Sequence, residues 1–245
     1  MRHAPDQSLD ASFMTLDLHP DFTVHKLTIG AERAPLLVID NFIANADALV
    51  DLAASQSFGP GGQYFPGLRI AAPAEYQQVF SDRLRDLLFE FFQLSGSAFR
   101  FSLCHYSLVT TPAGRLQLIQ RIPHFDALES NGLASVHYLF RGNLGGTAFY
   151  RHRKTGFEYI DTTRREAYFR SLESENGGPN IPRPAYINGD TPLYEQIAKQ
   201  DGVFNRMLIY RRNSLHSGCI DKDFVPDPNP RTGRLSINCF IDMEP

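Results

Sequence analysis

Residues 123–126 of this 245-residue chain read Pro123-His124-Phe125-Asp126. We predict that this stretch ends a strand formed by Leu116 to Ile122. Alternate side chains of a strand share one face, so His124 and Asp126 would follow the apolar residues of the strand into the interior of a barrel. An imidazole and a carboxylate on one face can bind a single metal ion. The same two residues can also form a simple hydrogen bond at a strand end, so the motif needs support from the rest of the chain.

A catalytic metal rarely has only two protein ligands, and His216 is the best candidate for a third. It lies in the segment Asn213-Ser214-Leu215-His216-Ser217-Gly218. Two imidazoles and one carboxylate suit non-haem Fe(II) and leave coordination positions open. We expect other roles for the remaining histidines of this region: His105 and His137 as core or pocket residues, and His152 in a solvated basic turn.

The predicted strand from Arg234 to Asp242 has one polar face. Its residues alternate between a polar set (Arg234, Ser236 and Asn238) and an apolar set (Leu235, Ile237, Cys239 and Ile241). A buried arginine without a partner is costly, and a bound dicarboxylate would supply the partner, because the arginine fork binds carboxylates in bidentate fashion. Arg234 and Ser236 are therefore candidate ligands for a carboxylate, with Arg231 as a competitor for the role of Arg234.

The segment Phe58 to Arg69 contains four glycines and two prolines, which predict a loop. Two interpretations remain open. The loop could pack Tyr64 and Phe65 on the body of the protein, or it could line the mouth of a pocket, with Arg69 available to an anionic substrate. On the second interpretation the candidate substrate-pocket residues are Arg69, Tyr64 and Asn238.

Apolar periodicity predicts a mostly β protein with flanking helices, an α+β fold. Short strand-like segments recur from residue 99 to 242, whereas Ala74 to Leu94 has the apolar spacing of an amphipathic helix. We interpret residues 1–245 as a single domain, with 1–98 as an N-terminal support and 99–242 as the core. Residues 161–205 interrupt the strand pattern and are expected to be an insertion. A short helix is expected within it at Leu193 to Lys199.

Composition narrows the choice of partners and compartment. The chain has 24 Lys and Arg against 27 Asp and Glu, so its net charge of −3 gives no signal for nucleic acid or an anionic membrane surface. Cys104, Cys219 and Cys239 form no disulfide framework and fit a reducing compartment. The first residues lack the apolar core of a signal peptide, and no apolar run approaches the length of a membrane span. We expect a soluble cytoplasmic protein that acts on a small molecule or a peptide; its oligomeric state is not predicted.

Three of these features together resemble a known signature. Pro123-His124-Phe125-Asp126, His216 and Arg234-Leu235-Ser236 resemble the HxD…H…RxS pattern of Fe(II)/2-oxoglutarate-dependent dioxygenases, close to the prolyl-hydroxylase-like branch. Ser135-Val136-His137-Tyr138-Leu139 and Gly145-Gly146-Thr147-Ala148-Phe149 resemble the Tyr-Leu strand and the GGxxxF segment of that branch.

The resemblance implies a double-stranded β-helix, a jelly-roll or cupin-like barrel, with the N-terminal helices packed on its major sheet. It implies iron held by His124, Asp126 and His216. Arg234 and Ser236 would bind the distal carboxylate of 2-oxoglutarate, with Tyr138 or Tyr106 as a further donor. The expected cofactors are Fe(II), 2-oxoglutarate and O₂, and the expected reaction hydroxylates a C–H bond with release of succinate and CO₂.

Two alternatives use the same scaffold. A cupin-like metal enzyme would not use 2-oxoglutarate, and Arg234 would then bind an acid group of the substrate itself. A non-catalytic binding protein would retain the barrel without turnover. The sequence does not identify the substrate in any of the three cases.

Overall fold

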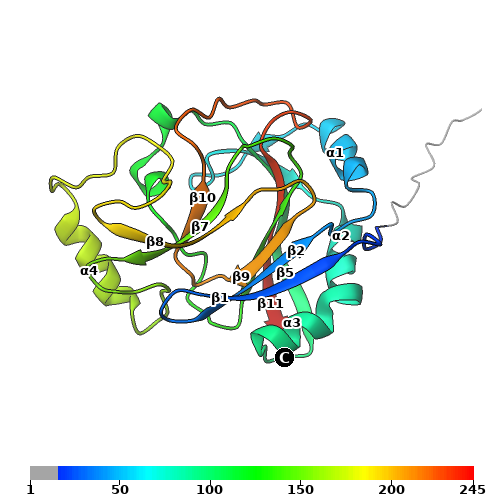
Figure 1. Ribbon diagram of the computed structural model, residues 1–245, viewed down its shortest axis with the longest axis horizontal. Coiled ribbons are helices and arrows are strands. Elements are labelled where there is room, and N and C mark those ends of the chain that lie inside the picture. Colours follow the sequence, from blue (N-terminus) through cyan, green and yellow to red (C-terminus); the bar gives the residue numbers. More distant parts are fainter. Residues whose placement is uncertain (1–15) are drawn as a thin grey trace, which may run out of the picture.

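The computed structural model describes residues 16–245, so the first 15 residues of the predicted N-terminal support lie outside it. In the described part, eleven strands form two antiparallel sheets, with helices on either side of the barrel (Figure 1). The larger sheet has the order β1-β2-β9-β6-β11-β5-β4-β3 and the smaller sheet the order β10-β7-β8. The strands are β1 Thr23–Ile29, β2 Ala34–Asp40, β3 Gly59–Pro60, β4 Gly67–Ala71, β5 Ala98–Val109, β6 Leu133–Tyr138, β7 Gly146–His152, β8 Tyr194–Asp201, β9 Met207–Arg211, β10 His216–Cys219 and β11 Leu235–Glu244.

From β5 onward the chain alternates between the two sheets. It passes from β5 in the larger sheet to His124, which bridges β10 of the smaller sheet, and then to β6 in the larger sheet. The strands β7 and β8 follow in the smaller sheet, β9 in the larger, β10 in the smaller and β11 in the larger. This alternation is a double-stranded β-helix, so the predicted jelly-roll fold is confirmed.

Helices cover the outer face of the larger sheet. They are α1 Ala46–Ala54, α2 Ala74–Val79 and α3 Arg85–Phe92, with a single π-helical turn, η1 Phe80–Leu84, joining the last two. The predicted helix from Ala74 to Leu94 therefore forms, and its apolar stripe is buried against the sheet. A second core lies between the two sheets and includes Val136, Tyr138, Phe149 and Tyr210. No helix among residues 16–245 is long and apolar enough to cross a membrane.

The predicted strand from Leu116 to Ile122 is wrong. Two short 3-10 helices, η2 Ala113–Arg115 and η3 Leu118–Arg121, occupy this region. The Gln117 backbone N–H donates to the Gln120 side chain at 2.9 Å, and the two residues form a reciprocal cap for η3. This local capping satisfies backbone groups that a strand would have paired with a neighbour.

The predicted helix from Leu193 to Lys199 is also wrong. Tyr194 to Lys199 belong to β8, which pairs with β7 along its length. One strand of the barrel thus lies inside the segment that we interpreted as an insertion. The rest of that segment contains α4 Arg165–Glu175 and the connection that leads into β8.

His152 is not in a solvated turn. Its side chain is 0% exposed, and its two ring nitrogens hydrogen-bond to Thr155 at 2.9 Å and to Glu175 at 3.0 Å. The rings of Tyr168 and Tyr194 each lie 5.2 Å from the His152 ring, measured between centroids. His152 therefore connects α4 to the smaller sheet.

Glu158 attaches the β1–β2 turn to the barrel. Its carboxylate, 1% exposed, accepts two hydrogen bonds from Arg151 and one from each of the backbone N–H groups of Ala31 and Glu32. Gly30 has a φ of +69°, and a Cβ built there would lie 2.0 Å from a Glu158 carboxylate oxygen. Only glycine fits this close approach.

Candidate metal centre

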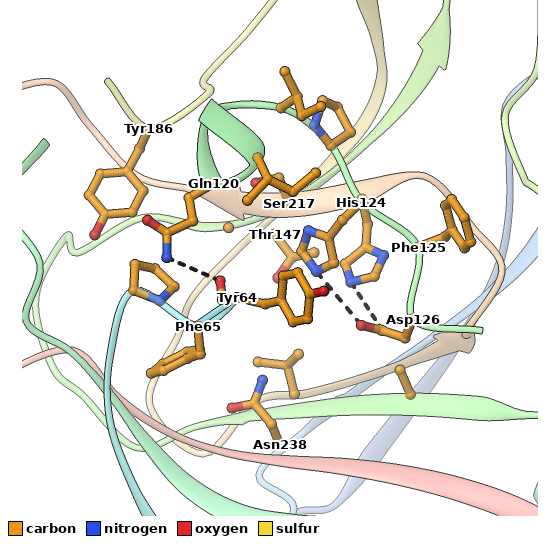
Figure 2. Close-up of a pocket in the computed structure, with 18 of the residues that line it drawn as sticks. Tyr64, Phe65, Gln120, His124, Phe125, Asp126, Thr147, Tyr186, Ser217 and Asn238 are labelled. Atoms are coloured by element: carbon orange, nitrogen blue, oxygen red, sulfur yellow. Dashed lines mark hydrogen bonds and ion pairs between the residues drawn. The ribbon is translucent and has the colours of Figure 1, made fainter. Parts of the chain in front are cut away.

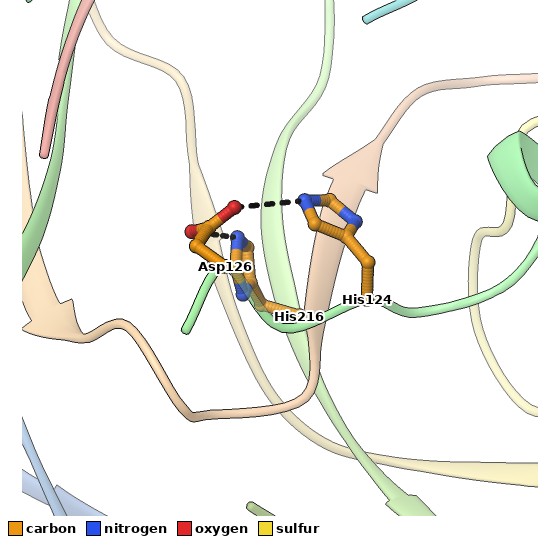
Figure 3. Close-up of side chains that lie close together, drawn as sticks. All are labelled: His124, Asp126 and His216. Atoms are coloured by element: carbon orange, nitrogen blue, oxygen red, sulfur yellow. Dashed lines mark ion pairs between the residues drawn. The ribbon is translucent and has the colours of Figure 1, made fainter. Parts of the chain in front are cut away.

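His124, Asp126 and His216 lie together at one end of the space between the sheets (Figure 3). One ligand atom from each residue lies within 4.8 Å of the other two. His124 Nε2 is 3.7 Å from Asp126 Oδ1, and His216 Nε2 is 3.5 Å from Asp126 Oδ2. The two histidines and the carboxylate thus face one point from two separate segments of the chain.

Backbone hydrogen bonds join these two segments. The N–H of His124 donates to the carbonyl of His216 at 2.9 Å, and the N–H of His216 donates to the carbonyl of His124 at 2.9 Å. The N–H of Asp126 donates to the carbonyl of Arg212 at 2.8 Å. Although the predicted strand before it is absent, His124 forms a bridge with His216 of β10 and Asp126 hydrogen-bonds to Arg212, and both side chains face the same site.

The tautomer of His216 is fixed by its surroundings. Its Nδ1 lies 2.9 Å from the carbonyl oxygen of Ser214, which can only accept, so Nδ1 carries the proton and Nε2 presents a lone pair toward Asp126. The ring is buried, with the Tyr210 ring 4.7 Å away between centroids. Burial, together with the neighbouring His216 ring, lowers the pKa of His124. Its side chain is still 48% exposed to the cavity, so solvent moderates this lowering.

The three residues fit a divalent metal ion. Asp126 Oδ2 is buried and has no hydrogen-bond partner among the described residues. A partnerless buried carboxylate oxygen is unfavourable, and a cation bound between the three side chains would satisfy it. Two neutral imidazoles and one carboxylate are the donor set that suits Fe(II), while Mn, Co, Ni and Zn ions can bind the same atoms.

Arg234 lies in the same cavity and is 5% exposed. Its Nε and Nη2 donate to the carbonyl oxygens of Leu144 and Gly146, each at 2.8 Å. No carboxylate among residues 16–245 forms an ion pair with it, so its positive charge has no counter-charge within the described chain. The predicted alternation of the last strand occurs: Ser236 and Asn238 line the cavity with Arg234, whereas the apolar set lies in the core beneath the helices.

Tyr138 is buried beside Arg234 rather than in the cavity wall. Its hydroxyl hydrogen-bonds to the Thr147 hydroxyl at 2.6 Å, and the Arg234 guanidinium carbon lies 5.9 Å from its ring centroid. Burial raises the pKa of Tyr138 to about 12, so the phenol is protonated at neutral pH. Thr147 itself lines the cavity. Sequence reasoning missed Thr147, although it belongs to the quoted segment Gly145–Phe149.

Two candidates for carboxylate binding are wrong. Tyr106 lies opposite Ile237 in the β5–β11 pairing, which directs it into the core beneath the helices and away from the cavity. Arg231 is exposed and forms an ion pair with Asp51 on the surface. Arg234 is therefore the arginine that lines the cavity from this part of the chain.

His137 is a core residue, as expected. It is fully buried, donates to the Asn205 side chain at 3.0 Å and stacks on the Tyr76 ring with centroids 5.8 Å apart. Burial lowers its pKa to about 4, with the hydrogen bond to Asn205 opposing the shift. The imidazole is therefore neutral at neutral pH.

The cavity has a volume of about 590 Å³ and is lined by the metal-site residues together with Arg69, Tyr64 and Asn238 (Figure 2). The segment from Phe58 to Arg69 was predicted to be a loop, but it contains β3 and the start of β4, which pair with each other. Tyr64, Phe65 and Arg69 of this segment line the cavity, as in the second of the two interpretations. Gln120, which was not among the predicted site residues, also lines the cavity and donates to the Tyr64 carbonyl at 3.4 Å (Figure 2).

Comparisons with known proteins give a family and a set of distant structures. Residues 20–241 match the model of a family described as "Family of unknown function (DUF6445)". No curated protein matches the chain. HygX from Streptomyces hygroscopicus, solved with nickel and 2-oxoglutarate bound, is 10% identical, with 86% of this chain and 84% of that chain covered and a TM-score of 0.46.

Two further solved structures have similarly low sequence identity to this chain. A Pseudomonas putida prolyl-4-hydroxylase is 15% identical, with 82% of this chain and 88% of that chain covered and a TM-score of 0.37. EctD from S. alaskensis, in its apoform, is 12% identical, with 93% of this chain and 88% of that chain covered and a TM-score of 0.43.

Proposed function

We propose that this protein, which belongs to the DUF6445 family, is an Fe(II)/2-oxoglutarate-dependent oxygenase. The observation that carries the proposal is the presence of two complementary features in one cavity. A triad of two imidazoles and a carboxylate can hold an iron ion, and Arg234, which is buried with no counter-charge from residues 16–245, can bind an acid nearby. A cupin-like metal enzyme could use the second feature only if its own substrate carried an acid group that pairs with Arg234.

Each residue has a defined task in this proposal. His124, Asp126 and His216 would hold the ion through Nε2, a carboxylate oxygen and Nε2. Arg234 would donate its remaining N–H groups to the distal carboxylate of 2-oxoglutarate, and the Ser236 hydroxyl, now donating to Asn238 at 2.8 Å, would turn toward the same carboxylate. The Tyr138–Thr147 hydroxyl pair would offer a further donor through Thr147.

When bound, the iron would activate O₂ so that one oxygen atom oxidises 2-oxoglutarate to succinate and CO₂ and the other enters a C–H bond of the substrate. The chain itself orients the reactants and limits the access of water. Phe149 and Tyr210 pack against His216 on the inner side of the site, with centroids 6.4 and 4.7 Å from that ring. We further propose that the protein works in the cytoplasm, where its three free cysteines would stay reduced.

Anaerobic titration tests the proposal directly. Fe(II) and 2-oxoglutarate added to the folded protein should give the weak visible charge-transfer band of the chelate, and admission of air should then yield succinate. Absence of the band from folded protein would refute the proposal. A band without succinate across a broad set of substrates would instead favour a binding protein.

A pair of arginine variants tests the assignment of the carboxylate site. Arg234→Ala should abolish 2-oxoglutarate binding while calorimetry still detects binding of Fe(II) or Ni(II). Arg231→Ala is the matched control, because it removes a surface arginine of the same connection, and it should bind both ligands as the parent does. Loss of 2-oxoglutarate binding in Arg231→Ala alone would show that the assignment is wrong.

A further inference from the structure

We propose that the primary substrate is a monocarboxylic acid with an apolar tail, whose carboxylate binds Arg69. This inference rests on the proposed function, because it places the substrate in the same cavity as the iron and 2-oxoglutarate. Three features of the cavity support it: the state of Arg69, the balance of charges, and an apolar groove that continues the cavity on its other side.

Arg69 is positioned as a ligand-binding side chain. It lies on β4 directly opposite Ser107 of β5, and its Nε donates to the Ser107 hydroxyl at 3.0 Å. Its guanidinium carbon lies 4.1 Å from the centroid of the Phe65 ring. These two contacts fix the plane of the guanidinium and leave its two terminal nitrogens without a partner among residues 16–245. The guanidinium lines the cavity and is partly buried there.

The charges of the site leave Arg69 unbalanced. A divalent ion and Arg234 together offset Asp126 and the two carboxylates of 2-oxoglutarate. The only other charged side chain of the cavity wall, within the described chain, is Arg69. Burial lowers the pKa of Arg69, and the Asp126 carboxylate opposes this shift. Once Asp126 is neutralised by the metal ion, a single negative charge on the substrate would restore the balance. A carboxylate matches both that charge and the flat fork of the guanidinium.

The rest of the substrate is indicated by the groove beside the cavity. This groove has a volume of about 330 Å³ and shares Ile119, Ile122, Phe169 and Leu172 with the cavity. Its other apolar lining residues are Leu118, Ile181, Pro182 and Leu193.

Several groove residues are unusually exposed for their type. Leu118 is 40% exposed, Ile119 43%, Phe169 40% and Ile181 46%. Clustered exposed apolar side chains mark binding surfaces more often than plain surface. Because the groove is continuous with the cavity, its occupant in this proposal is the tail of the substrate. The carbon to be oxidised would then lie between the two anchors, beside the metal site.

Calorimetry on the nickel- and 2-oxoglutarate-loaded protein tests the proposal without turnover. The probes are straight-chain acids from butanoate to octanoate and their primary amides, which have the same shape and no charge. Each acid should bind more tightly than its amide by about tenfold or more, the usual effect of a charge-assisted hydrogen bond. Affinity should also rise with chain length as the tail enters the groove.

Three variants test which residues cause the preference for acids and which cause the dependence on chain length. Arg69→Met should remove the preference for acids and keep the dependence on chain length. Ile119→Ser should weaken the dependence on chain length and keep the preference for acids. Arg100→Met is the matched control, because Arg100 is an exposed arginine that pairs with Asp242 on the far end of β5 and does not line the cavity. It should behave as the parent does.

The outcomes separate this proposal from the one on which it rests. Nickel and 2-oxoglutarate binding is measured first, and its failure in the parent protein would refute the oxygenase assignment itself. With both ligands bound, the substrate proposal is overturned if no acid binds more tightly than its amide, or if Arg69→Met keeps the preference. It is also overturned if Arg69→Met loses 2-oxoglutarate, because Arg69 would then belong to the cosubstrate site.

Discussion

Replacement of Asp126 by asparagine should stabilise the metal-free protein and abolish its response to metal. The Oδ2 atom of Asp126 is buried without a hydrogen-bond partner in the described part of the chain, and the side chain is only 11% exposed. A buried unsatisfied polar atom costs about 1–3 kcal/mol. Asparagine keeps the shape, removes the charge and can donate toward the lone pair of His216 Nε2. The attraction between Asp126 and Arg69 is lost, so we expect a net gain of about 1 kcal/mol.

Thermal unfolding with and without Ni²⁺ measures both effects. A gain of about 1 kcal/mol corresponds to a rise in Tm of roughly 2–4 °C for a chain of this size. Metal at 100 times its Kd should stabilise the parent by about 2.7 kcal/mol and leave Asp126→Asn unchanged. The order of the two melting temperatures should therefore reverse when metal is added.

Asp242→Asn is the control for this experiment. Asp242 pairs with Arg100 at 2.9 Å and also with Arg212, so its carboxylate is satisfied in the native protein. This variant should melt below the parent both with and without metal. The reasoning is refuted if Asp126→Asn melts below the parent without metal, or if it retains the stabilisation by Ni²⁺.

Three other perturbations have defined outcomes. Tyr138→Phe removes the hydrogen bond to Thr147 and should lower the free energy of unfolding by about 1 kcal/mol. Calorimetry should also show a several-fold weaker affinity for 2-oxoglutarate. An unchanged affinity would mean that Thr147 does not contribute to the cosubstrate site. Glu158→Gln weakens the buried ion pair with Arg151 and should lower the free energy of unfolding by about 3 kcal/mol, measured as a lower urea midpoint. A urea midpoint equal to that of the parent within experimental error would contradict the role given to this carboxylate. The pKa of His137 is about 4 in the folded protein and about 6.5 in the unfolded chain. As the pH falls, the unfolded chain therefore binds a proton at His137 before the folded protein does. Stability should therefore fall by up to about 3 kcal/mol between pH 6.5 and 4, and His137→Gln should flatten urea-derived stability across that window.

The sequence indicated the site better than it indicated the elements that hold it. The alternation of polar and apolar residues in β11 correctly separated Arg234 and Ser236 from the apolar set in the core. When one face of a strand is buried, every second residue is apolar, and this pattern can be read from the sequence. The grouping of His124, Asp126 and His216 was predicted from ligand chemistry, from the alternation of an expected strand and from the resemblance to a known signature. The structure brings the three residues together although that strand is absent.

Some of the failures have a local physical cause, and others have a cause in a distant part of the chain. The strand expected before His124 is replaced by 3-10 turns, since Gln117 and Gln120 cap each other. The helix expected near Leu193 is a strand because pairing with β7 outweighs its local pattern. His152 was expected in solvent because its neighbours are basic, but α4 supplies Glu175 from a separate part of the chain. Tyr106 was placed in the cavity without regard to which face of β5 it occupies.

The reciprocal backbone hydrogen bonds between His124 and His216 have a consequence for how the protein matures. They are non-local contacts, and β6, β7, β8 and β9 all lie between the two histidines in the sequence. Contacts of this kind form late, because the loop that separates them must first be closed. A partly folded chain would therefore present His124 and Asp126 without the third ligand, His216, and would have little affinity for iron. Only the completed barrel would capture the ion. Metal binding would then report that the barrel is fully folded. If iron is added for a short time during refolding, the protein should retain it only after the amides of His124 and His216 become protected from hydrogen exchange.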